Sequence, residues 1–398
     1  MAKGETTKRS ELDADHLIAR LRTRAAERLA DQEEIWAIVD PSELRKPYAK
    51  EMPDLMRVRK LGGEGTVRGY RTVNVLGVGT GGVRGLLYHH LFSSVAADFL
   101  SESREIQDAL LSVDQVLASK RGHVTYVMDT QFDDIAVWGS IWGQGNHLVC
   151  RLKHLERLID PEGNLAPGAH APSNSVISVA AARDQLREQA RVRTEMLVQK
   201  VGQRFSKRQP TTAVIRACPI GIRYQTGQRT STAGPVQSKP VWLVEVRLEN
   251  VATDPWLLVT DWPVTDEASA LQAFRTYRTR WAIEDCFKFT KDVLGWEDVQ
   301  LLDFAGIRTL VALGWVAAGF LYELGVTLEW SEIRLLVRLG GGELRENRPP
   351  GKALLTRGLQ RLLDHWATDA ILADEIRRHG TLPPRLAAFL GPDWSSPS

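Results

Sequence analysis

Cysteine, net charge and long apolar runs are all scarce in this 398-residue chain. Its three cysteines, Cys150, Cys218 and Cys286, lie far apart and lack the spacing of metal ligands. This pattern excludes a disulfide framework, and we expect reduced, buried thiols in a cytosolic protein. Lys and Arg number 51 against 49 Asp and Glu, so the net charge is only +2. Overall charge therefore does not indicate a nucleic-acid partner, and a DNA-binding surface would have to come from local charge.

The chain also lacks an apparent signal peptide and a long apolar run. The most apolar stretch, from Thr309 to Tyr322, covers about fourteen residues between Arg308 and Glu323. A bilayer-spanning helix takes about 20 residues, so this stretch predicts a core helix. We expect no membrane partner and a cytoplasmic location.

The length predicts two or three domains and a large core. Periodicity and turn residues indicate an α/β core in two parts, with a turn-rich linker and a β-rich insertion between them and helical segments at both ends. The predicted boundaries are 1–33 for the N-terminal helical segment, 34–160 and 263–325 for the core, 161–262 for the linker and β insertion, and 326–398 for the helical C-terminal region.

Two apolar β-type runs end in an aspartate. The first ends at Asp40, and Pro41 should stop that strand because proline cannot donate to a sheet. The second ends at Asp129 and is followed by a predicted helix and another strand, which is a βαβ arrangement. Both acids should therefore lie at the carboxyl edge of a sheet, although strand-end aspartates are often only turn residues. Asp133 and Asp134 compete with Asp129, but acids at a helix start usually interact with the helix dipole.

A glycine-rich stretch, GVGTGG, offers another function. Gly77, Gly79 and Gly82 have the spacing of a dinucleotide-binding loop after a strand. No clear helix follows them, so a hairpin turn between two strands is the favoured interpretation. His89 and His90 follow on the second strand, where neighbours point to opposite faces and do not easily share a metal ion.

Polar side chains share one face of the helix predicted to begin at the cap Thr265. At helical periodicity, Tyr277, Arg280, Glu284 and Lys291 fall within roughly 60° of arc. A carboxylate flanked by donors suited to phosphate oxygens is what a metal-dependent phosphoryl-transfer site needs. An ordinary amphipathic helix with surface charges is the alternative.

The spacing Tyr-x2-Arg-x3-Glu-x6-Lys resembles the signature of bacterial insertion-sequence DDE transposases. The resemblance spans roughly residues 34–325 and includes Ser42, two residues after Asp40. It implies a ribonuclease-H-like mixed sheet flanked by helices, interrupted by a mainly β insertion domain, with a helical C-terminal region. The family usually has Arg after the second aspartate and a longer N-terminal domain, whereas this chain has Thr130 and a short N-terminal segment.

The resemblance also implies the site and the reaction. Asp40, Asp129 and Glu284 would be catalytic and would hold two Mg²⁺ or Mn²⁺ ions, with Asp40 bridging both. Water would nick the end of the element, and the freed 3′-hydroxyl would then attack a second phosphodiester bond. The implied DNA-binding residues are Tyr277, Arg280, Lys291, Arg151, Lys153 and His154. A homodimer on DNA is expected, because joining two ends takes two active sites.

Two other functions stay open. The chain could be a DNA-binding relative that has lost its chemistry, or a ribonuclease-H-like nuclease without strand transfer. Residues 183–208 carry eight Lys or Arg against three Asp or Glu. That stretch is a candidate DNA surface, although a solvated charged face fits the same pattern.

Overall fold

The computed structural model describes residues 13–60, 64–161, 176–198, 207–225, 236–251, 253–298, 301, 303–344 and 351–380. The chain forms two compact units, Met1–Gly319 and Phe320–Ser398. Most of the predicted linker after Pro161, the glycine-rich part of the insertion and the last eighteen residues lie outside the described residues.

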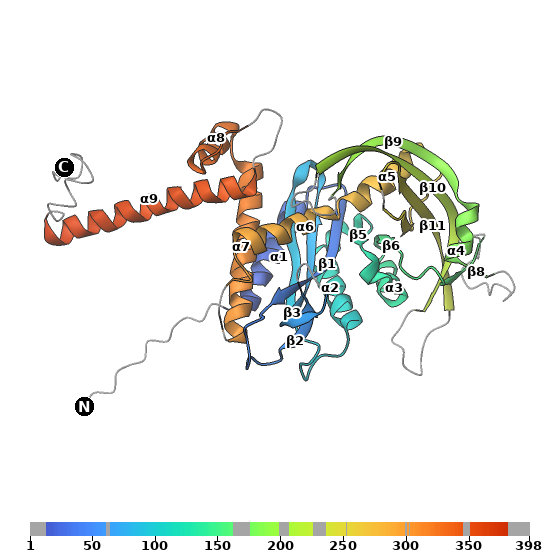
Figure 1. The fold of residues 1–398 in the computed structure, drawn as a ribbon, viewed down its shortest axis with the longest axis horizontal. Helices are drawn as coiled ribbons and strands as arrows, with labels where there is room; N and C mark the ends of the chain where they lie inside the picture. The colour runs from blue at the N-terminus through green and yellow to red at the C-terminus, as the bar shows by residue number, and fades with distance from the viewer. Residues whose placement is uncertain are drawn as a thin grey trace. The chain divides into compact units, whose positions relative to one another are not determined.

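The first unit combines a large sheet with helices (Figure 1). Its strands are β1 (Ile35–Arg45), β2 (Met56–Arg59), β3 (Thr66–Val78), β4 (Arg84–Phe92), β5 (Val124–Met128), β6 (His147–Arg151), β7 (Leu158–Ile159), β8 (Ile177–Ser178), β9 (Arg187–Val198), β10 (Lys207–Gln225), β11 (Val236–Leu248) and β12 (Trp256–Thr260). Its helices are α1 (Ala14–Leu29), α2 (Glu102–Val116), α3 (Ile135–Gly143), α4 (Val179–Ala182), α5 (Glu267–Arg278), α6 (Trp281–Lys288), a π-helical turn at Phe289–Val293, and the first part of α7 (Phe304–Thr327).

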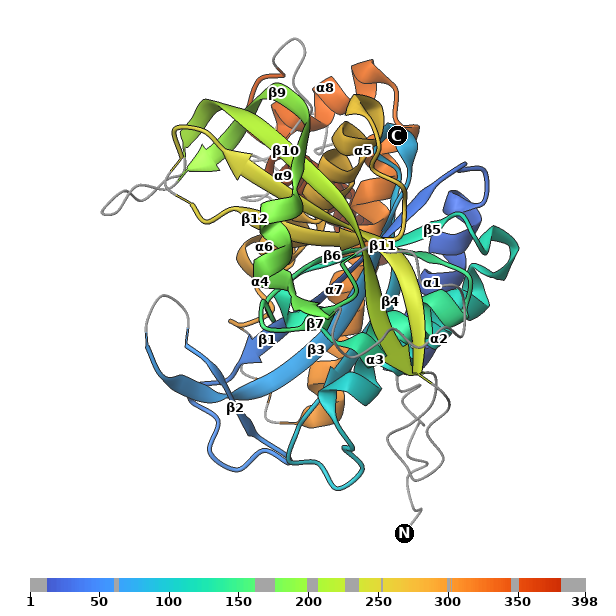
Figure 2. The same cartoon turned by 90° about the vertical axis from the view of Figure 1, so that its right-hand side faces the viewer.

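The main sheet is mixed and mostly antiparallel, with the order β2-β3-β1-β5-β6-β12-β11-β10-β9 and β4 paired to β3. Strand β1 runs antiparallel to β3 and parallel to β5, and β5 runs parallel to β6. The β-rich insertion does not place its strands β9 to β12 in a separate sheet. Instead, its strands extend the same sheet, because β12 pairs antiparallel with β6. Figure 2 shows the long strands β10 and β11 curving away from the centre.

Side-chain alternation gives the sheet two different faces. Ala37 and Val39 of β1 face a core that α1, α2 and α3 cover. The opposite face carries Asp40 and Trp256, and Trp256 contacts the rings of Phe274 and Tyr277 in α5. Helices α5 and α6 follow one another across this second face (Figure 1). Polar residues on the second face therefore point toward α5 and α6.

The glycine-rich stretch forms the predicted hairpin between β3 and β4. Gly81 and Gly82 have φ of 70° and 86°, a left-handed conformation that side chains disfavour. No helix begins after these glycines, which contradicts a dinucleotide-binding loop. The three cysteines are free and buried, as expected.

Strand β1 does not stop at Pro41, and this expectation was wrong. It continues to Arg45, with Pro41 opposite Val73 of β3. Its parallel pairing with β5 ends at Val39, so only one side of β1 is paired beyond this point. A proline is tolerated there because an unpaired strand side does not need its N–H.

The single helix predicted from Thr265 is divided into α5 and α6. Asp266, rather than Thr265, caps α5 by accepting from the backbone N–H of Ser269. Between the helices, the N–H groups of Thr279 and Arg280 donate to carbonyls three residues earlier, and the Thr279 hydroxyl donates to Thr276. This local bonding competes with the regular α-helical pattern and interrupts it at Thr279 and Arg280.

The apolar run predicted from Thr309 to Tyr322 belongs to the longer helix α7, which has 24 residues. The expectation that it is too short for a bilayer was wrong, because single charges at Arg308 and Glu323 do not end a helix. Among the described residues, α7 alone is long and apolar enough to cross a membrane. One such helix is weak evidence for a membrane partner, and its residues Val311 and Trp315 are buried in the protein.

The second unit contains α8 (Trp330–Leu339) and α9 (Lys352–His379), which pack through a small core. This core contains Ile333, Leu336, Val337 and Leu355. Gly358 of α9 lies so close to Leu336 that an added Cβ would be 1.9 Å from its carbonyl oxygen. The C-terminal region is helical as predicted, as far as the structure describes it.

Candidate active site

The two predicted aspartates lie at neighbouring strand positions on the same face of the sheet. Val39 pairs with Met128 in the parallel register of β1 and β5, so Asp40 and Asp129 are the next residues on each strand. Asp129 directly follows β5 and accepts a hydrogen bond from the backbone N–H of Thr130. Asp40 is still within β1, because that strand continues. The prediction that these acids come together at the edge of the parallel strands is supported by this register.

Arg280 joins both aspartates to Glu284. Its Nη1 lies 3.3 Å from Asp40 Oδ2 and 3.8 Å from Asp129 Oδ2. Its Nη2 donates to Glu284 Oε1, one helical turn further along. The side chain of Glu284 is half-exposed, whereas those of Arg280 and Asp40 are mostly buried. Carboxylates from β1, β5 and α6 therefore surround one guanidinium.

Tyr277 supports this cluster from α5. Its hydroxyl donates to Asp129 Oδ1 at 3.1 Å, and its ring lies 5.3 Å from that of Trp256 on β12. Burial, together with the Asp129 charge, raises the pKa of Tyr277. Tyr277 therefore stays protonated and holds Asp129 by donating a hydrogen bond to its carboxylate. It was expected to contact DNA, and in this arrangement its contact is with the acid.

Burial also shifts the charge state of Asp40. Burial is the largest cause, and together with the charges of Glu284 and Asp129 it raises the pKa of Asp40 to about 7, although Arg280 opposes the shift. Burial lowers the pKa of Arg280, but the surrounding acids outweigh it and raise that pKa overall. Asp40 is therefore partly protonated near neutral pH when no cation is bound.

Lys291 lies beside the acid cluster rather than within it. Its Nζ donates to the backbone oxygen of Glu43 at 2.8 Å and lies 3.6 Å from Glu297 Oε1. Arg45 binds the same carboxylate at 3.0 Å. Burial lowers the pKa of Lys291. Because Lys291 is in the π-helical turn, its direction departs from the regular helical spacing used to predict it.

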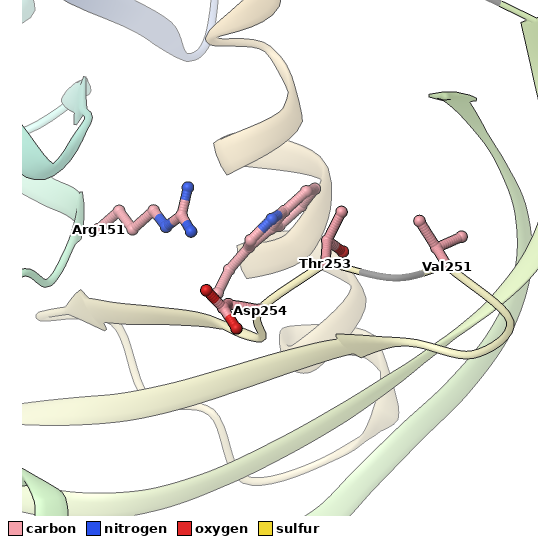
Figure 3. A pocket seen from close by; sticks show the side chains of 5 residues that line it. Arg151, Val251, Thr253 and Asp254 are labelled. Carbon is pink, nitrogen blue, oxygen red and sulfur yellow. The ribbon is translucent and has the colours of Figure 1, made fainter. Parts of the chain in front are cut away.

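Arg151 lines a cavity next to Tyr277. The cavity has a volume of about 550 Å³, and Val251, Thr253, Asp254 and Trp256 also line it. Figure 3 shows the Arg151 guanidinium extending into the space across from Thr253 and Asp254. Arg151 follows Cys150, which pairs with Met128, so it lies beside Asp129. A cation and an indole next to the acids are suited to a nucleotide.

Two further predicted DNA-binding residues, Lys153 and His154, lie in a turn that the Asp133 side chain stabilises. The backbone N–H groups of Lys153 and His154 both donate to Asp133 Oδ2, at 2.6 and 2.8 Å. Asp133 also binds Arg157 at 2.6 Å and is buried. Asp134 caps α3, so the expected role at the helix start holds for Asp134 and is wrong for Asp133. The His154 ring binds Glu156, which leaves Lys153 the more available cation.

A buried polar network behind Asp40 was not predicted. The Asn74 side chain donates to the Asp40 backbone oxygen at 3.1 Å and to Thr72 at 2.8 Å, and its oxygen accepts from His89 Nδ1 at 2.7 Å. Asn74 lies opposite Asp40 in the sheet, so both side chains are on one face. An asparagine within an apolar strand was the signal in the sequence, since a buried amide needs partners.

The acids fit hard cations by chemistry but not by their present positions. Carboxylate oxygens are the donors that Mg²⁺ and Mn²⁺ prefer. Among the described residues, however, no three His, Cys, Asp or Glu side chains lie close enough together to hold a metal ion. The guanidinium of Arg280 lies among the carboxylates instead.

No family model matches this chain, and no curated protein matches it. Its function is therefore inferred from the geometry of the site.

Proposed function

We propose that this protein is a DNA transposase that cleaves phosphodiester bonds at element ends and transfers the freed strand, with Asp40, Asp129 and Glu284 as its catalytic acids. The observation that carries the proposal is the contact of all three acids with Arg280. They come from positions far apart in the chain, and Asp40 and Asp129 lie side by side where the parallel pairing of β1 and β5 ends. The signature spacing and the mixed sheet, with β1 between an antiparallel and a parallel neighbour, add support for a ribonuclease-H-like core.

The chemistry divides between cations and side chains. Two Mg²⁺ or Mn²⁺ ions held by the three acids would neutralise charge on the attacking and leaving oxygens of the phosphodiester. Tyr277 orients Asp129 by its hydrogen bond, and Asn74 fixes the backbone at Asp40. Arg151, Lys153, His154, Arg280 and Lys291 form the proposed set of phosphate contacts. Two copies of the chain on DNA would supply the two sites that joining two ends requires.

A cleavage assay on the DNA that flanks the gene tests this function. With Mg²⁺, the protein should nick that DNA and yield joined products when target DNA is present. Asp40→Ala, Asp129→Ala and Glu284→Ala should each lower the cleavage rate by at least a thousandfold. As a matched control, Asp108→Ala removes a half-exposed acid of α2 that pairs with Arg104, and it should cleave normally. Undiminished cutting by any of the three site variants would contradict the proposal.

One observation favours a second function, a DNA-binding relative without chemistry. The guanidinium of Arg280 lies where cations would have to bind, and no metal cluster is formed among the described residues. A Mn²⁺ titration in the presence of DNA separates the two functions. Absence of Mn²⁺ binding would favour the inactive relative. In the cleavage assay, cut DNA without joined products would indicate a nuclease.

A further inference from the structure

We propose that Arg280 is an internal counter-ion that competes with divalent cations for the acid site, and that a DNA phosphate draws it away so that cations bind tightly only on DNA. This inference rests on the proposed metal-dependent function of the same site. It concerns the order in which the site is filled.

The Arg280 guanidinium fills the space that a cation shared by the three acids would need. Arg280 Nη1 is within 3.3 Å of Asp40 and 3.8 Å of Asp129, while Nη2 binds Glu284. A Mg²⁺ ion takes oxygen ligands at about 2.1 Å, so a cation shared by these acids needs the space that the guanidinium fills. Two like charges in a mostly buried site also repel each other strongly. Guanidinium and cation therefore exclude one another.

Arg280 does not use all of its hydrogen-bond donors in its present position. Its side chain is buried, yet its Nε has no hydrogen-bond partner. A buried donor without a partner costs free energy. A phosphate can accept two parallel hydrogen bonds from a guanidinium, including one from Nε, and such paired bonds are among the stronger ones. A phosphate can therefore accept a hydrogen bond from Arg280 Nε, which the three carboxylates do not.

The surroundings of Arg280 allow it to move from the acids to a phosphate. Glu284 is half-exposed and is the partner of Arg280 on the solvent side. Arg280 also lies in the short segment between α5 and α6, where backbone hydrogen bonds reach back three residues and have poorer geometry than α-helical bonds. Arg280 can therefore turn toward a phosphate beside Glu284 while Asp40 and Asp129 stay on the rigid sheet.

The consequence is a coupling between two ligands. If DNA removes Arg280 from the acids, DNA must raise the affinity for cations, and cations must raise the affinity for DNA by the same factor. A role for Arg280 in merely aligning the acids predicts the opposite effect of its removal. Without the guanidinium, misaligned acids would bind cations more weakly.

Mn²⁺ binding to the full-length protein, followed by the electron paramagnetic resonance signal of free Mn²⁺, distinguishes these possibilities. The probe is Mn²⁺ alone, and then Mn²⁺ with a 30-base-pair duplex taken from the DNA flanking the gene. Wild type should bind Mn²⁺ at least tenfold more tightly with the duplex than without it. Arg280→Gln should bind Mn²⁺ at least tenfold more tightly than wild type without DNA, and the duplex should add little.

Arg278→Gln is the matched control, because it removes the same charge two residues away. Arg278 binds the hydroxyl of Thr194 and the backbone of Glu195, not the acids. It should leave the affinity for Mn²⁺ near that of wild type. Thermal unfolding by circular dichroism verifies that each variant is folded. Arg280→Lys keeps a positive charge, so without DNA it should bind Mn²⁺ as weakly as wild type does.

The outcomes separate this inference from the proposed function. If wild type binds Mn²⁺ on DNA but Arg280→Gln binds no more tightly than wild type without DNA, the counter-ion role is wrong and the metal site stands. If neither protein binds Mn²⁺ in any condition, the metal-dependent function is wrong, and the competition is wrong with it.

Discussion

Asp40 and Arg280 are buried although both carry ionisable groups. Burial of a charge is costly unless partners compensate, and here each compensates the other in part. The acid keeps a pKa of about 7 because burial and the neighbouring carboxylates outweigh the guanidinium. At the scale of the residue, the site is therefore poised to change its charge near neutral pH.

Mn²⁺ binding should depend on pH because Asp40 must lose its proton to become a ligand. With a pKa of about 7 for Asp40, affinity should fall by about tenfold for each pH unit below 7. Mn²⁺ titrations on DNA at pH 6, 7 and 8 measure this dependence. Asp40→Asn should lose most of the affinity together with the dependence. An affinity for wild type that is constant from pH 6 to 8 would contradict the role of Asp40.

His89 should make the protein less stable in acid. Burial lowers the pKa of His89 to about 3, whereas an unfolded histidine has a pKa of about 6.5. The neutral ring therefore stabilises the fold above pH 6.5, and this stability is lost as the pH falls toward 3. The loss approaches about 1.4 kcal/mol per pH unit.

Urea unfolding at pH 7, 6, 5 and 4 tests this dependence. His89→Gln should show a shallower decline than wild type, because it takes up no proton and can still donate to Asn74. The exposed His123 of the same unit provides the control, and His123→Gln should follow wild type. Equal declines for wild type and His89→Gln would show that His89 does not cause the acid sensitivity.

At the scale of elements, α7 depends on a close approach between a glycine and a tryptophan. An added Cβ on Gly314 would lie 2.0 Å from Trp296 Nε1, and Trp296 packs edge-on against Trp315 of the same helix. Gly314→Ala should therefore lower the free energy of unfolding by about 1–3 kcal/mol.

Gly325 in the same helix is the matched control, since no atom lies within 4 Å of its added Cβ. Gly325→Ala should be neutral or stabilise the helix by about 0.5–1 kcal/mol. Chemical denaturation of both variants measures the difference. Equal stability of the two variants would show that Trp296 can move aside freely.

The sequence predicted those elements whose signals are local. Asp129 at the end of its strand, the hairpin at Gly81 and Gly82, and the helix that carries Glu284 follow from periodicity and turn residues. The break between α5 and α6 also had a signal in the sequence, Thr276 and Thr279, but a hydroxyl bond to the backbone is only one of several options for threonine.

Pairings between distant residues could not be predicted in the same way. The contact of Lys291 with Glu297 depends on a π-helical turn, and Asp133 reaches the turn at Lys153 only because β6 lies beside β5. The extension of the sheet through β12 depends on strand pairing, which alternation alone does not specify.

At the scale of the whole molecule, the chain has two units with very different cores. The first has a core of many large buried side chains, whereas the described core of the second contains only Ile333, Leu336, Val337 and Leu355. A small core supplies little stability. Two units of this kind need not unfold together.

Calorimetry should therefore show two transitions, with the second unit unfolding at the lower temperature. Gly358→Ala should lower only that transition, because its Cβ would meet the backbone of Leu336 at 1.9 Å. Gly351→Ala, whose Cβ would meet nothing within 4 Å, is the control and should not lower it. A single transition that both variants leave unchanged would contradict two separate units.

The central claim is that Asp40, Asp129 and Glu284 form one cation site on DNA. Its most direct test is anomalous X-ray diffraction from crystals of the full-length protein with Mn²⁺ and a duplex from the flanking DNA. We expect two anomalous peaks about 4 Å apart among these three carboxylates, with the Arg280 side chain in contact with a DNA phosphate. Peaks elsewhere, or none at these acids while Arg280 still contacts them, would contradict it.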